Sequence, residues 1–324
     1  MSLLLQTRSR SNPITPLSSA TWFACYFITV MIGGAILGGI LIRVGIQSDS
    51  GFWHDFILEH GPARILRRFQ TLFAIFLAPL MLKKIGWGGV RDLGWSSRQL
   101  RVERKQDFIR WFTIGLVSMC ILFTISLLSG VRDWKAFSAG TLIVAIFKGF
   151  LITGIGVGII EETLTRGVLY RSLARAWLPW IAAIVSSLLF AWAHFMKASP
   201  ESFEQGVGAI VMSSLFADFA KQAVPLKFLN MLAFGIVLSR LVFHRGNIWA
   251  AVGLHAAAVG AIKVFSQMTD FVKEAGYHPW IGGHSSRFDD GWMMTLLLFS
   301  LFCLVEFGNR YSGSTSASTS RVHL

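Results

Sequence analysis

Apolar runs of about twenty residues recur along this chain, and they limit its possible folds more than any other feature. The first run, 21–42, carries no charged side chain. A helix of roughly this length crosses the hydrocarbon core of a bilayer. Only helices and closed barrels satisfy their own backbone hydrogen bonds there. Barrel strands would appear as alternating segments of about ten residues, which the sequence lacks. We therefore expect an all-α, polytopic membrane bundle.

The apolar runs predict about eight transmembrane helices. The expected helices cover residues 21–42, 69–82, 108–128, 141–176, 180–196, 226–243, 248–267 and 291–307. Pro79 lies inside the second helix and is expected to kink or tilt it. Residues 197–224 are expected to be less regular, with a short amphipathic helix near 207–219.

Basic residues predict the orientation of the chain. The chain carries 30 Lys and Arg against 17 Asp and Glu, a net charge of +13. The segment 83–110 holds many of these basic residues, which predicts a cytoplasmic loop and a cytoplasmic amino terminus. Nucleic-acid binding would need a basic patch on a folded soluble domain. No polar stretch is long enough for one, so the expected partners are lipid and a membrane-associated substrate.

Two adjacent glutamates, Glu161 and Glu162, follow the nearly unbroken apolar run 142–160. A charged side chain within a membrane helix is costly, so it normally faces the bundle interior or a water-filled cavity and is a functional candidate. Glu162 and Arg166 are spaced for an i,i+4 ion pair. That pair would leave Glu161 on a different face, free for chemistry. The alternative is that both glutamates only mark a membrane boundary.

Two histidines lie where they could join these glutamates. A turn is expected at 177–179, and Glu161 and His194 each lie about 16 residues from it, or about 24 Å along a helix. Antiparallel packing would therefore bring them to one level. Phe190 precedes His194 by one turn and can line a pocket. His255 lies among small residues that allow close helix packing. Each histidine alone also fits an ordinary hydrogen-bonded core residue.

A glutamate with one or two histidines suits hydrolysis by water. A carboxylate in an apolar pocket is a stronger base, and a neighbouring histidine can share the proton of the water. A second histidine can stabilise the oxyanion. The same residues, Glu161, His194 and His255, could also bind a divalent metal such as zinc. The His-Glu-x-x-His and Gly-x-Ser-x-Gly motifs are both absent.

Three short motifs carry a resemblance to a known family. They read Glu161-Glu-Thr-Leu-Thr-Arg166, Phe190-Ala-Trp-Ala-His194 and His255-Ala-Ala-Ala-Val259. In this order they resemble the Glu-Glu-x-x-x-Arg, Phe-x-x-x-His and His-x-x-x-Asn motifs of the CPBP family. This family includes CAAX prenyl endopeptidases and bacteriocin-processing, Abi-like intramembrane proteases. The resemblance covers about residues 140–265.

The resemblance implies a role for each matched residue. Glu161 would activate the water together with His194, while Glu162 and Arg166 hold the helix in place. His255 would belong to the oxyanion-stabilising part. The chain departs from the family pattern at position 259, where valine replaces an asparagine that is often present. This change removes an amide donor, and the nearest alternative in the sequence, Asn247, is remote.

Composition and the resemblance together divide the chain. Composition predicts a cytoplasmic segment 1–20 and amino-terminal helices with a basic loop at 21–135, and the resemblance implies a catalytic core at 136–270. A loop with the last helix at 271–311 and a disordered tail at 312–324 would follow.

The implied function is that of an intramembrane protease, a hydrolase and candidate metalloprotease, that cleaves a membrane-associated, CAAX-type prenylated protein or peptide. The cofactor is either a divalent metal or none. A non-enzymatic immunity or scaffold protein on the same fold and a proton-coupled transporter are the alternatives. No secretory or organellar segment is recognisable, which predicts a multi-pass protein of a bacterial inner (plasma) membrane.

Overall fold

The computed structural model describes most of the chain as helix. The described residues are 16–48, 51–87, 89, 91–95, 101–221, 225–272, 280–281 and 291–318. Contacts divide the chain into two compact units. The first consists of Met1–Gly88 and Ala191–Ala223, and the second of Gly89–Phe190 and Val224–Leu324.

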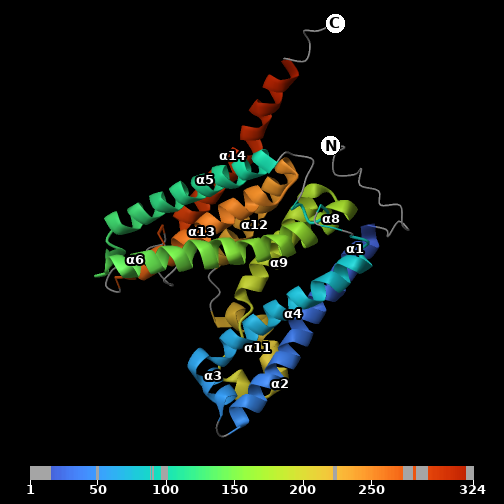
Figure 1. The fold of residues 1–324 in the computed structure, drawn as a ribbon, viewed down its shortest axis with the longest axis vertical. Coiled ribbons are helices and arrows are strands. Elements are labelled where there is room, and N and C mark those ends of the chain that lie inside the picture. The colour runs from blue at the N-terminus through green and yellow to red at the C-terminus, as the bar shows by residue number, and fades with distance from the viewer. Residues whose placement is uncertain are drawn as a thin grey trace. The chain divides into compact units, whose positions relative to one another are not determined.

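The first unit is a set of packed helices (Figure 1). Its elements are α1 (Pro16–Ile28), the π-helical turn η1 (Thr29–Gly33), α2 (Gly34–Gln47), α3 (Phe52–His60), α4 (Pro62–Lys84), α10 (Ser202–Gln205) and α11 (Val207–Lys221). α1, η1 and α2 form one continuous helix. α2 packs closely on α4 at Gly38, where a Cβ atom would stand 2.7 Å from Leu66 and 2.8 Å from Phe69. A small-residue face on the first helix is therefore used for helix packing.

The second unit contains the two glutamates. Its elements are α5 (Arg101–Leu128), β1 (Arg132–Trp134), α6 (Ala139–Ile146), the π-helix η2 (Phe147–Val157), α7 (Gly158–Glu162), the π-helix η3 (Thr163–Tyr170), α8 (Arg171–Ala176), α9 (Pro179–Phe195), α12 (Pro225–Arg245), α13 (Trp249–Met268), β2 (Thr269–Phe271) and α14 (Trp292–Ser318). α9 belongs to this unit as far as Phe190. The run from α6 to α8 is one long helix with π-helical stretches on both sides of the glutamates.

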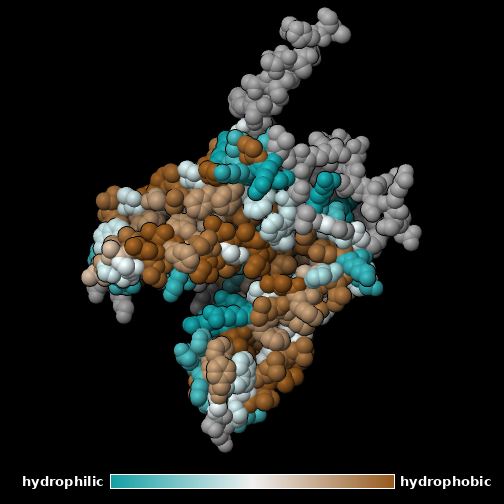
Figure 2. All heavy atoms as spheres, viewed as in Figure 1, coloured by the Kyte–Doolittle hydropathy of each residue, from teal (hydrophilic) through white to brown (hydrophobic). Residues whose placement is uncertain are grey.

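The all-α, polytopic architecture is confirmed. Six helices in the described part of the chain are long and apolar enough to cross a membrane. They are Thr21–Gln47, Pro62–Lys84, Arg101–Leu128, Ala139–Ala176, Leu226–Arg245 and Trp249–Met268. The two other expected helices form as shorter apolar helices, Pro179–Phe195 and Trp292–Gly308. Apolar side chains cover much of the surface of each unit (Figure 2), as expected for helices that face lipid.

Several helix bounds differ from the sequence-based ones. α4 begins at Pro62 and α5 at Arg101, both earlier than predicted. The added turns are rich in arginine and lysine. These residues favour helix, but they are too polar to be recognised as part of an apolar run. α14 continues to Ser318, beyond the expected end at 307 and into the stretch predicted to be a disordered tail.

A two-stranded antiparallel sheet was not predicted. β1 pairs with β2, with Asp133 opposite Asp270. The guanidinium of Arg132 donates a hydrogen bond to Thr269 Oγ1 at 2.9 Å, and both residues are buried. Three-residue strands carry too few residues to show an alternating pattern, so sequence periodicity cannot reveal them.

α13 is the most deeply buried of the six spans, and it packs against α5 and η2. These three elements lie side by side in Figure 1. Gly149 and Gly154 of η2 both face α13, since a Cβ atom there would meet Val264 at 2.9 Å and the Ala256 carbonyl oxygen at 2.5 Å. Hydrogen bonds in a π-helix join residues five apart, which matches the spacing of these two glycines. These two glycines let α13, which carries His255, approach η2 closely.

Candidate active site

The two glutamates point in different directions from the short helix α7. The Glu161 side chain is 34% exposed, whereas the Glu162 side chain is completely buried. This agrees with the sequence-based expectation that Glu162 engages a partner and leaves Glu161 on another face. Glu161 is therefore the more exposed of the two carboxylates, although its Oε2 atom, which faces His255, is buried.

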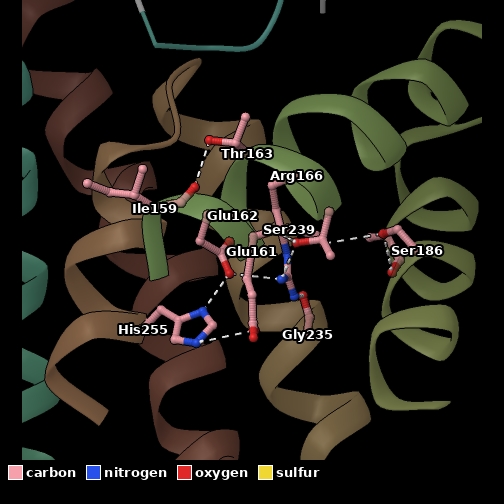
Figure 3. Close-up of polar contacts among 11 residues, drawn as sticks. Ile159, Glu161, Glu162, Thr163, Arg166, Ser186, Gly235, Ser239 and His255 are labelled. Carbon is pink, nitrogen blue, oxygen red and sulfur yellow. Dashed lines mark hydrogen bonds and ion pairs between the residues drawn. The ribbon is translucent and has the colours of Figure 1, made fainter. Parts of the chain in front are cut away.

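Glu162 holds an arginine and a histidine at the same time (Figure 3). Its Oε1 atom accepts a hydrogen bond from Arg166 Nη1 at 2.9 Å and lies 2.7 Å from His255 Nδ1. All three side chains are buried. Because a carboxylate can only accept, Nδ1 of His255 must be the donor in this contact. The predicted i,i+4 pair of Glu162 and Arg166 is present.

Arg166 ties this helix to two others. Its Nη2 donates to the Gly235 carbonyl oxygen of α12 at 3.2 Å, and its Nη1 also donates to Thr165 Oγ1 at 2.7 Å. The guanidinium carbon lies 4.3 Å from the ring centroid of Phe190 on α9, a cation–π geometry. The arginine thus supports the site through its charge, its hydrogen bonds and its flat face.

The imidazole of His255 lies between the two carboxylates. Its Nε2 atom is 3.7 Å from Glu161 Oε2, while its Nδ1 faces Glu162. The edges of two aromatic rings close the other sides, with centroid distances of 6.3 Å to Phe190 and 5.7 Å to Phe234. Phe190 thus contacts both Arg166 and His255 through its ring.

His194 lies in the last turn of α9, four residues after Phe190. It belongs to the residues of the first unit, whereas Glu161, Glu162, Arg166 and His255 all belong to the second. The four residues of the second unit are brought together by its fold. The approach of His194 to Glu161 remains a prediction that rests on their equal spacing from the turn.

The valine at the departure from the family motif lies one turn after His255. Val259 is half-buried and brings no hydrogen-bonding group. Asn247 does not supply the missing amide. Its Nδ2 donates to Asp107 Oδ2 at 3.1 Å and its Oδ1 accepts from the backbone N–H of Trp249 at 2.9 Å. Asn247 instead fastens the start of α13 to α5.

Two contributors to the site had no sequence signal. Gly235 acts through a backbone carbonyl, which every residue possesses, and Phe234 is one of 27 phenylalanines. Both lie on α12, outside the three motifs. Their importance depends on where α12 packs, and only the folded chain reveals that.

The metalloprotease expectation finds no support. Within the described ranges, no group of three or more His, Cys, Asp and Glu side chains could hold a metal ion. Glu162 Oε1 and His255 Nδ1 already bind each other. Of the expected ligand set, Glu161 and His255 lie together in the second unit, whereas His194 belongs to the residues of the first.

The comparisons with known proteins point to one family. Residues 143–260 match the family model described as Type II CAAX prenyl endopeptidase, Rce1-like. No curated protein and no solved structure matches the chain. The matched segment contains both glutamates, Arg166 and both candidate histidines. The match shows that this segment of a multi-pass membrane chain is similar to an Rce1-like type II CAAX prenyl endopeptidase domain, which supports a CPBP-type intramembrane protease.

Proposed function

We propose that this protein cleaves a peptide bond of a membrane-associated, CAAX-type prenylated protein or peptide, with a water molecule activated by Glu161. The observation that carries the proposal is the pairing of a partly accessible carboxylate with a buried, firmly held histidine, 3.7 Å apart. Buried ionisable groups inside a membrane bundle are functional candidates, and these lie in the family-matched segment.

The proposed reaction begins with proton transfer from water to the Glu161 carboxylate. The water oxygen then bonds to the carbonyl carbon of the scissile peptide, and the carbonyl electron pair moves to its oxygen. Nε2 of His255 faces this region, and in the doubly protonated imidazolium, whose Nδ1–H stays on Glu162, its Nε2–H is proposed to stabilise the oxyanion. The oxyanion electron pair then re-forms the carbonyl, and the C–N bond breaks as the proton passes to the leaving nitrogen, directly from Glu161 or by way of His194.

The roles of the remaining residues follow from their contacts. Arg166 is proposed to hold α7, α9 and α12 together through Glu162, Phe190 and Gly235. We place the protein in a bacterial inner membrane, with the basic loop 83–110 in the cytoplasm. The 136–270 segment is proposed as the catalytic core, because it contains every group named in the reaction.

Amino-terminal labelling of membrane proteomes tests this proposal. Wild-type protein and Glu161→Gln are expressed at equal levels in the same null background. New peptide termini that appear only with the wild type are expected, and their sequences identify the substrates. Equal sets of termini, with both proteins folded and abundant, would refute the role of Glu161.

The loss of the family asparagine favours a second candidate, an immunity or scaffold protein that has kept the fold without its catalysis. This candidate predicts that a cellular phenotype of the wild type survives Glu161→Gln. The proteolytic function predicts that the phenotype is lost with the same substitution. The transporter alternative has no observation in its favour.

A further inference from the structure

We propose that Glu162 is the positioning residue for His255: its bond to Nδ1 sets the ring so that Nε2 faces Glu161 and the scissile peptide. The inference rests on the proposed function and adds a role that the sequence did not suggest. From the sequence, Glu162 only pairs with Arg166. In the structure the same oxygen atom serves both partners.

The contact is short and shielded from water. Glu162 Oε1 and His255 Nδ1 are 2.7 Å apart, and the relative exposure of the two residues is 0% and 2%. Hydrogen bonds to a carboxylate are stronger than neutral ones, and the low dielectric of a buried site strengthens them further. A proton held on Nδ1 leaves Nε2 to meet the reacting groups, where it accepts a proton in the neutral ring and donates to an oxyanion once the ring is an imidazolium.

The two aromatic neighbours of His255, Phe190 and Phe234, do not determine which ring nitrogen faces Glu161. Phe190 and Phe234 present their rings edge to face with the imidazole, at 82° and 73° to it. Such contacts limit the tilt of the ring, but they treat its two nitrogens alike. Glu162 is the described hydrogen-bond partner of Nδ1. Glu162 therefore fixes the Nδ1 side of the ring through a hydrogen bond, while Glu161 lies farther off, 3.7 Å from Nε2.

Arg166 does not need Glu162 for all of its support. It also donates to Thr165 and to the Gly235 carbonyl, and it stacks on Phe190. A helix-holding role could be filled by these contacts in part. For Nδ1 of His255, the described hydrogen bond is the one to Glu162. Loss of the Glu162 charge should therefore affect the orientation of His255 more than the position of the helix.

The chain contains a matched control for this carboxylate. Glu306 on α14 accepts from Arg240 Nε at 2.6 Å and Nη2 at 3.0 Å, and lies 3.3 Å from His244 Nε2. It thus combines the same three groups, a carboxylate, an arginine and a histidine, without any described contact to the site residues. Glu306→Gln therefore measures how much kcat changes when a carboxylate in such a cluster is neutralised away from the site.

The first test uses purified full-length protein and a prenylated reporter peptide. Glu162→Gln should lower kcat by between about 10-fold and 10⁴-fold, the range seen when an orienting partner is changed, with a smaller change in KM. Glu306→Gln should leave kcat unchanged. In a His255→Gln background, Glu162→Gln should cause no further loss, because the two residues act as one unit. An additive loss would overturn the proposal.

The second test needs no peptidase activity. ¹⁵N-histidine NMR of the full chain reads which ring nitrogen carries the proton, with His255 assigned by its absence in His255→Gln. In the wild type, Nδ1 should be protonated. In Glu162→Gln or Glu162→Asp the His255 signals should shift or split, and in Glu306→Gln they should stay.

The two tests separate the inference from the function beneath it. An unprotonated Nδ1 in the wild type, or unchanged His255 signals in a folded Glu162 variant, would overturn the positioning role. If the expected NMR result appears and no reporter peptide is cleaved, the orientation of His255 stands and the proposed proteolysis fails. The wild-type spectrum decides the orientation even if every Glu162 variant fails to fold.

Discussion

Gly154 lies against Ala256 so closely that a Cβ atom on the glycine would stand 2.5 Å from the Ala256 carbonyl oxygen. Ala256 directly follows His255, so this contact sets how near α13 comes to the helix that carries the glutamates. Gly158, one turn further along, lies 3.7 Å by the same measure from the Ala256 nitrogen. The distance between Glu162 and His255 therefore depends on two glycines, Gly154 and Gly158, that let the helices approach.

Gly154→Ala should separate these two helices. The added carbon meets a backbone atom that cannot rotate away, and overpacking of this kind typically costs about 1–3 kcal/mol. We expect a lower unfolding temperature in detergent and reduced peptidase activity. Gly156→Ala is the control, since its Cβ atom would lie at an ordinary 3.6 Å from Leu151. Equal effects of both substitutions would contradict the close-packing explanation.

Arg166→Met should be strongly destabilising. It leaves the fully buried Glu162 without its cation, and removal of one partner from a buried ion pair costs about 3–5 kcal/mol. Denaturation in mixed micelles measures the loss. The double variant Arg166→Met with Glu162→Gln should be more stable than Arg166→Met alone, because no uncompensated charge remains. A double variant less stable than either single variant would show that the ion pair is not the cause.

Phe190→Leu should weaken the support of Arg166 while largely keeping the packing volume. The guanidinium carbon is 4.3 Å from the ring centroid, and a desolvated cation–π contact contributes about 2 kcal/mol. Phe190→Ala adds a cavity and should cost about 3–5 kcal/mol. Thermal unfolding of both variants tests this order. If Phe190→Leu is as stable as the wild type, the ring stacking contributes nothing.

Val259→Asn should raise kcat. The substitution restores an amide donor one turn after His255, and removal of a single oxyanion donor from a hydrolase costs about 10²–10³ in kcat. Steady-state kinetics with a prenylated peptide would show the gain, with KM nearly unchanged. Val259→Thr, which has no amide, is the control. An unchanged or lower kcat in folded Val259→Asn would mean that this protein stabilises its oxyanion without position 259.

Membrane helices were predictable from the sequence, and candidate site residues could be named from it, for physical reasons. A bilayer admits long apolar helices only, so runs such as 21–42 and 248–267 determine the architecture. Charges within such runs are costly, which singled out Glu161, Glu162 and Arg166. The i,i+4 spacing of Glu162 and Arg166 is local helix geometry, and that ion pair is present in the structure.

Helix ends and short strands were less predictable. Hydropathy reports where a chain meets lipid, but a helix continues into water as long as its residues favour helix. This explains the early starts of α4 and α5. The strand pair of Arg132–Trp134 and Thr269–Phe271 joins segments far apart in the chain, and no local pattern specifies such a pairing.

The sequence by itself determined which side chains are candidates for the chemistry, because a charged residue within an apolar run stands out in the sequence. Only the tertiary structure decided what those side chains contact. It turned Glu162 towards His255 as well as Arg166, committed Asn247 to Asp107, and brought Gly235 and Phe234 to the site. These contacts join residues on different helices, and side-chain packing at close range, rather than hydropathy or spacing, selects them.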